Sequence, residues 1–188
     1  EKILIIALES KDQTQITNAV TDVLKKCILT RNVKVDELPT FDIEYLFLNI
    51  RAKSIGEDIK MTVTCPDDKV TQVPVTIYVD EIEVIRPEDH TTDIVLDDKM
   101  TLRMKYPSLN QFIESNFDVK DKSETLVDKT FKVIADCIDT VYTEEDAWEG
   151  KDYSSTERVK FIEQLNSKQY KEVEKFFSTM PKLSKTIE

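Results

Sequence analysis

The chain has 188 residues, of which 40% are apolar, so it is long enough and apolar enough to form a sizeable hydrophobic core. Its formal net charge is -11, which argues against nucleic acids and anionic membranes as partners, because both favour basic surfaces. No apolar stretch reaches the roughly 18 residues that a membrane span needs. Only two glycines are present, Gly56 and Gly150, and this excludes the glycine-rich loops that bind nucleotide phosphates.

Helices are predicted for residues 1–57. Residues 1–9 are nearly all apolar and compatible with a helix. Because this helix is already under way at Glu1, and because the chain stops at Glu188 without a final strand or tail, we expect a chain that is truncated at both ends. Ser10 can cap a second helix, whose apolar residues recur at helical spacing. They are Ile16, Val20, Val23, Leu24, Cys27 and Ile28.

A third helix is predicted from Thr40, after Pro39, to a stop at Gly56. It is apolar on most sides, which is typical of a helix that is buried or covered by a partner. We therefore expect Leu46 and Phe47 to be largely buried.

The period of the apolar residues changes to two over 58–107, which predicts two β-hairpins. The first pairs the run around Ile59–Cys65 with the run Val73–Val79, through a turn at 66–69. Its alternation predicts one solvent-exposed face and one dry face, with Cys65 toward the core. Pro74 cannot donate a hydrogen bond to a neighbouring strand, so it indicates an edge strand or a bulge. The second hairpin joins Ile94 to Tyr106 through a turn at 97–99.

Residues 108–188 are predicted to be helical, with no further strand. A short helix follows Ser108, and an apolar stripe from Leu126 to Val141 indicates a long one. After an acidic loop, Ser154 and Glu157 form a capping box for the next helix. Ser167 is expected to cap the last helix, which Pro181 ends. The chain is thus predicted to be an α+β protein in one continuous unit, with a helical N-terminal region (residues 1–57), a β-hairpin sheet (residues 58–107) and a helical C-terminal region (residues 108–188).

No catalytic, cofactor or metal site is expected. Cys65 opens a Cys-Pro turn like that of a zinc knuckle, but position 68, where a second cysteine would be needed, is Asp68. Cys27 and Cys137 lie far away on apolar helix faces and are expected to be buried, reduced thiols. His90, the single histidine, has no nucleophile beside it and is expected to be solvated.

Several residues are candidates for binding a partner. Glu144, Glu145 and Asp146 precede Trp148 in the acidic loop. This loop is either a solvated segment that Trp148 anchors to the core, or a partner-binding loop with Trp148 as its anchor. The open sheet edge at Pro74 is a further candidate. Phe176 and Phe177 are adjacent on a helix and cannot share a face, so whichever faces outward is also a candidate for contact with a partner.

The order of motifs resembles the baseplate hub proteins of T-even-like contractile-tailed phages. The resemblance rests on three stretches, "LFLNIRAKSIGEDIKMTVTCP", "TLRMKYPS" and "CIDTVYTEEDAWEGKDYSSTERVKFIEQLNSKQYKEVEKFF". Relatives can carry a second cysteine after the Cys-Pro turn, where this chain has Asp68. The resemblance implies a non-enzymatic structural or assembly protein of the tail baseplate hub, with other hub proteins as partners. It would be found in the virion tail or, during assembly, in the cytoplasm of the infected host.

Two other functions stay open at this point. One is a metal-dependent hydrolase that uses the carboxylates around Trp148. The other is a small regulatory binding module with the sheet as its platform. Neither nucleic acid, nor a membrane, nor a small-molecule substrate is expected as a partner.

Overall fold

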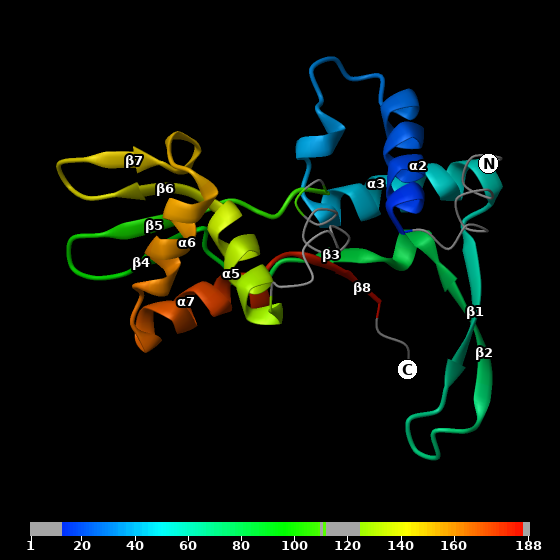
Figure 1. The fold of residues 1–188 in the computed structure, drawn as a ribbon. Coiled ribbons are helices and arrows are strands. Elements are labelled where there is room, and N and C mark those ends of the chain that lie inside the picture. The colour runs from blue at the N-terminus through cyan, green and yellow to red at the C-terminus, as the bar shows by residue number, and fades with distance from the viewer. Residues whose placement is uncertain (1–12, 110, 112–124, 186–188) are drawn as a thin grey trace.

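The computed structural model describes residues 13–109, 111 and 125–185. These residues form two lobes joined by a narrow connection (Figure 1). Helices lie in the N-terminal and C-terminal regions and antiparallel strands between and beside them, so the predicted α+β class is confirmed. The helix predicted for residues 1–9 and most of the one predicted after Ser108 lie outside the described residues.

Among the described residues, two helices form the N-terminal lobe. They are α2 (Gln13–Cys27) and α3 (Thr40–Ile55), linked through the 3-10 turn η1 (Val35–Glu37). Leu24, Val35, Ile43 and Leu109 form the buried centre of this lobe. The helix positions agree with the prediction. Leu46 and Phe47 are only partly buried, however, because they lie at the border of this small core rather than inside it.

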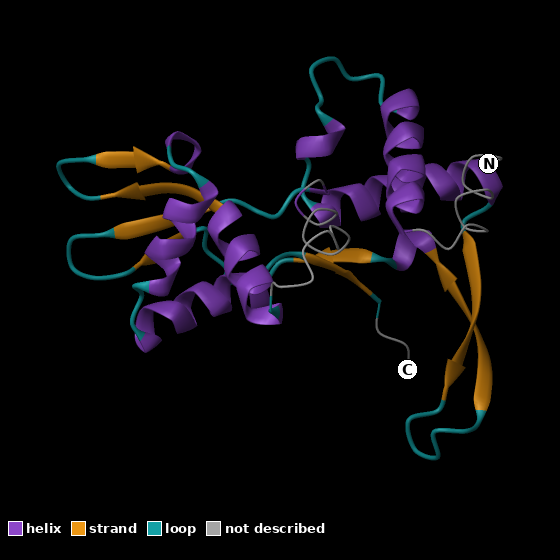
Figure 2. Ribbon diagram, viewed as in Figure 1, coloured by secondary structure: helices purple, strands orange, loops and turns teal. Residues whose placement is uncertain are grey.

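A two-stranded antiparallel ribbon follows α3. It consists of β1 (Asp58–Thr64) and β2 (Gln72–Tyr78), and Figure 2 shows it extending away from the helices. The predicted hairpin is confirmed, and Pro74 lies in β2 opposite Thr62. The predicted burial of one face is wrong, because within the described residues most of the ribbon's side chains are exposed on both faces.

A short strand pair ties the two lobes together. The 3-10 turn η2 (Val79–Glu81) leads into β3 (Glu83–Ile85), which pairs antiparallel with β8 (Lys182–Ser184) near the C-terminus. β8 also contacts α3. The sequence was expected to contain no strand after residue 107, so β8 is a correction. The chain therefore returns from the C-terminal lobe to the N-terminal one (Figure 1).

The C-terminal lobe is a four-stranded antiparallel sheet packed against helices. The strands, in the order in which they pair, are β4 (Asp93–Val95), β5 (Thr101–Met104), β6 (Ile138–Tyr142) and β7 (Ala147–Glu149). The helices are α5 (Leu126–Asp136), α6 (Ser155–Glu163) and α7 (Ser167–Ser178). Buried side chains from the sheet and from all three helices, among them Leu102, Ile134, Ile162 and Phe176, form one core.

Two predictions for this lobe were wrong. Residues 138–149 were expected in a helix and a loop, yet they form β6 and β7. The helix α5 ends at Asp136 with Cys137 as its C-cap, and the β-branched residues that follow, Ile138, Thr140 and Val141, favour a strand. The capping box of Ser154 and Glu157 is confirmed, but the last helix is capped by Asn166 rather than Ser167.

Aromatic rings fill the connection between the lobes. The Phe41 ring of α3 meets the Tyr106 ring edge-on, at 5.1 Å between centroids. Tyr106 stacks on His90 and on Phe176. His90 was expected to be solvated, yet its Nε2 lies 2.9 Å from the Tyr106 hydroxyl and its Nδ1 2.9 Å from the Thr179 hydroxyl. Burial lowers the pKa of His90 despite the carboxylate of Asp89 nearby. Through Tyr106, this side chain supports the ring that meets Phe41 of the N-terminal lobe.

Candidate protein-docking site

An open pocket of about 430 Å³ lies between the sheet and α6 in the C-terminal lobe. Ile138 and Val141 of β6 and Phe161 of α6 contribute apolar walls. Val141 lies directly opposite Trp148 of the edge strand β7, so both side chains point to the same face of the sheet. Trp148 remains 38% exposed and Tyr153 40% exposed, which places two aromatic side chains in contact with both the pocket and solvent.

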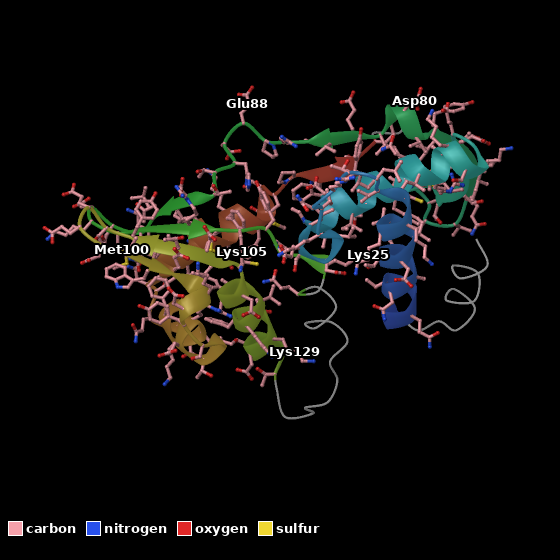
Figure 3. All side chains as sticks on the ribbon, turned by 90° about the horizontal axis from the view of Figure 1, so that it is seen from above. Lys25, Asp80, Glu88, Met100, Lys105 and Lys129 are labelled. Carbon is pink, nitrogen blue, oxygen red and sulfur yellow. The ribbon has the colours of Figure 1, made fainter. Side chains whose placement is uncertain are left out.

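Met100 lies in the turn between β4 and β5 and lines the same pocket. Figure 3 shows it near one end of the molecule, far from Asp80 and Lys25 of the N-terminal lobe. The pocket therefore belongs to the C-terminal lobe alone.

Arg158 fixes the base of the pocket. Its Nη2 lies 2.5 Å from Asp136 Oδ1 at the end of α5. Its Nη1 donates to the carbonyl oxygens of Gly150 at 2.9 Å and Tyr153 at 3.1 Å. One guanidinium group thus links α5, α6 and the 3-10 turn η3 (Gly150–Asp152). The Arg158 Nε is buried without a hydrogen-bond partner among the described residues.

Gly150 allows η3 to approach β6 closely. A β-carbon at this position would lie 2.5 Å from the carbonyl oxygen of Ile138, well inside van der Waals contact. Gly150 is therefore required by the close approach of two backbone segments beside the pocket.

The predicted acidic loop is the turn of the β6–β7 hairpin. Thr143 closes it: its hydroxyl accepts the backbone N–H of Asp146 at 3.1 Å, and its own N–H donates to the Asp146 carbonyl at 2.8 Å. Glu144, Glu145 and Asp146 are all exposed. These three carboxylates and Trp148 lie close together along the chain, as predicted. The segment that carries them is a β-hairpin, however, and not an irregular loop.

The other candidates lie elsewhere. Pro74 is exposed on the β1–β2 ribbon, in the other lobe. Phe176 is only 2% exposed and belongs to the core. Phe177 is partly buried and packs edge-on against Phe176 at 5.1 Å. Of the two phenylalanines, Phe177 is therefore the one that retains surface for a partner.

The Cys-Pro turn is held by Asp68. This carboxylate accepts the backbone N–H groups of Val70 at 3.0 Å and Thr71 at 2.9 Å, and also the Thr71 hydroxyl. These hydrogen bonds lower the pKa of Asp68 to about 2. Cys65 is half-exposed at the end of the ribbon, so the expectation that it faces the core is wrong, because the ribbon extends beyond the core.

The other two cysteines differ from each other. Cys137 is buried, and burial raises the pKa of its thiol to about 12. Cys27 is exposed at the last position of α2, so its predicted burial is wrong.

Within the described residues, no group of three or more histidine, cysteine, aspartate or glutamate side chains is arranged to hold a metal ion. Among the described helices, none has both the length and the apolar character needed to cross a membrane.

Most of the pocket was not predicted from the sequence. Trp148 was identified as a candidate, but Met100, Val141, Tyr153 and Arg158 were not, and the predicted acidic residues 144–146 do not line the pocket. The sequence did contain two usable signals. β-branched and aromatic residues at 140–142, followed by a polar turn and Trp148, are typical of a hairpin. Gly150, one of only two glycines in the chain, indicates a close backbone contact directly after this hairpin.

A family model described as "T4 bacteriophage base plate protein" matches residues 1–188, the whole chain. No curated protein and no solved structure matches the chain. As the resemblance in the sequence implied, the chain belongs to the T4 bacteriophage base plate protein family and is a structural protein of the phage tail baseplate, where it contacts other tail proteins.

Proposed function

We propose that this protein is a non-enzymatic structural or assembly component of the baseplate hub that acts through contacts with other hub proteins. It is made in the cytoplasm of the infected host. It is then either incorporated into the tail baseplate or needed only for baseplate assembly. In both cases it acts through its binding surfaces and not through a catalytic group that titrates. The observation that carries this proposal is the exposed apolar face of the β1–β2 ribbon.

The strand register defines that face. Residues paired directly across an antiparallel ribbon point to the same side, and the pairs Ile59–Ile77, Met61–Val75 and Val63–Val73 alternate with polar pairs. We call the first set the apolar face of the ribbon. Met61 is 42% exposed and Val73 46% exposed, whereas Ile59, Val75 and Ile77 are half-buried. The side that the alternation would bury is therefore open mainly in the half of the ribbon nearest its turn.

The size of this face favours a different protein over a second copy of this chain. Strands of seven residues give a face of roughly 24 Å by 10 Å, from the usual rise and spacing of strands. Stable interfaces bury about 800 Å² on each partner, and two such faces packed together would fall well short. A hub protein that surrounds the ribbon would bury more.

Two double substitutions test this proposal. Met61→Lys with Val73→Lys places charges on the apolar face. Thr62→Lys with Thr76→Lys places the same charges on the opposite, polar face and serves as the matched control, since all four positions are exposed. Both proteins should unfold at nearly the parent's temperature. In phage whose own gene for this protein is inactive, the control should restore complete baseplates and the apolar-face variant should not.

Normal baseplates with the apolar-face variant would refute the role of the ribbon. An equal defect in both variants would show that added charge, rather than the loss of an apolar contact, stops assembly.

A further inference from the structure

The pocket beside Trp148 has the chemistry of a receptor for one kind of protein segment. We propose that this pocket, lined by β6, β7, η3 and α6, binds a basic segment of another baseplate protein that inserts a large apolar side chain. The proposal rests on the proposed function in that it assumes protein partners, but it concerns a surface in the other lobe from the ribbon.

The pocket is the right size and is apolar inside. Its volume of about 430 Å³ falls within the range of roughly 300–1,000 Å³ that is usual for binding pockets. Ile138, Val141 and Phe161 offer it only aliphatic and aromatic surface. Protein interiors are close-packed, so an apolar hollow next to the core is space that a side chain from a partner can fill.

Two aromatic side chains border the opening. Trp148 and Tyr153 are each more than a third exposed, at 38% and 40%, although they also line the pocket. Tryptophan and tyrosine are enriched among the residues that dominate binding energy at protein interfaces. Their partial exposure leaves ring surface that an incoming leucine or phenylalanine can cover.

The pocket is held in shape before any partner arrives. Arg158 joins Asp136 to the carbonyls of Gly150 and Tyr153, and the capping box of Ser154 and Glu157 fixes the start of α6. Binding to such a preformed site orders few side chains and so costs less entropy.

The charge around the pocket selects a basic partner. Exposed carboxylates lie in the chain segments that build the pocket, namely strand β6, the β6–β7 turn and η3. They are Asp139, Glu144, Glu145, Asp146 and Asp152. The lysine of η3, Lys151, is already paired with Glu149. Complementary charge steers a partner toward a site and rejects like-charged ligands, so a lysine- or arginine-rich segment fits this rim and a phosphate-bearing ligand does not.

Peptides supply a direct test, because Trp148 is the only tryptophan in the chain. The probe is a peptide with Leu-Phe-Leu flanked on each side by three lysines. One comparison peptide replaces the centre with three alanines, and another replaces the lysines with glutamates. The first peptide should shift the fluorescence emission of Trp148 to shorter wavelength and bind at least about tenfold more tightly than either comparison peptide, because only it offers both the apolar side chain and the charge.

Two matched triple variants separate the site from the overall charge. Glu144→Gln, Glu145→Gln and Asp146→Asn remove three charges beside the pocket and should weaken binding about fivefold or more at low salt. Asp67→Asn, Asp80→Asn and Glu83→Gln remove three exposed charges outside the C-terminal lobe and should leave the affinity within about twofold. Tyr153→Ala should also weaken binding while the protein stays folded.

Equal affinity for the leucine-phenylalanine and alanine peptides, unchanged Trp148 emission, or equal losses in both triple variants would overturn the proposal. The ribbon variant Met61→Lys with Val73→Lys should bind the peptide as the parent does. A failure of the pocket and a failure of the ribbon are therefore distinguished.

Discussion

The two hairpins β1–β2 and β4–β5 are closed in the same way but lie in opposite surroundings. In the first, Asp68 accepts the N–H groups of the residues two and three positions later, and in the second, Asp97 does the same with Lys99 and Met100. Yet Leu102 of β5 is fully buried, whereas Val73 of β2 is 46% exposed. Helices cover one hairpin and leave the other uncovered within the described residues. The shared hydrogen bonds of the turn thus determine the local structure of each hairpin. Whether helices pack on the hairpin determines whether it belongs to the core or is available to a partner.

The largest expected contrast is in stability. Leu102→Ala leaves a cavity in the C-terminal core and should lower the free energy of unfolding by about 2–5 kcal/mol. Val73→Ala removes an exposed side chain and should cost less than about 1 kcal/mol. Denaturant unfolding of both variants measures the difference. If the two losses were similar, the ribbon's apolar face would be packed against the chain itself and the comparison would fail.

The two glycines extend the comparison, because Gly56 precedes the β1–β2 hairpin and Gly150 follows β7 in the C-terminal lobe. Gly56, which leads into β1, has a φ of 133°, a conformation that L-residues avoid, and a β-carbon at Gly150 would meet a backbone oxygen. Each change to alanine should therefore cost about 1–3 kcal/mol. Only Gly150→Ala should also alter the emission of Trp148, because Gly150 borders its pocket. An altered emission in Gly56→Ala would show that strain passes between the lobes.

A smaller effect is expected on the turn of the β1–β2 ribbon when the pH is lowered. The folded-state pKa of Asp68 is about 2, below its ordinary value of 3.8, so the hydrogen bonds to this carboxylate stabilise the ribbon's turn above pH 3.8 and are lost as the pH falls through 2. The backbone N–H resonance of Thr71 should therefore titrate with a midpoint near 2, and Asp68→Ala should abolish this titration. A midpoint near 4 would mean that the turn is open in solution.

Local features were predicted better from the sequence than their environment. The α3 helix, both hairpins with their aspartate turns, and the capping box at Ser154 follow from periodicity and short-range hydrogen bonding, and all are present. The strand β6 was missed because Ile138 and Val141 continue the helical spacing of α5, so periodicity alone could not separate helix from strand. The strand β7 was missed because its three residues were interpreted as part of an acidic loop.

Burial was harder to predict because it depends on what the rest of the chain places nearby. The alternation in β1 and β2 indicates an apolar face but contains no information on what covers it. The pocket was not predictable for the same reason, since Met100, Val141 and Arg158 come from three separate segments that meet only in the folded lobe.

The central claim is that the apolar face of the ribbon contacts another baseplate protein, and site-specific photocrosslinking tests it most directly. A photoreactive amino acid placed at Met61, on the apolar face, should form a covalent link to a different baseplate protein in assembled tails, while the same group at Thr62, on the polar face, should give markedly less. A link from position 61 to another segment of this same chain, or equal yields from both faces, would contradict the claim.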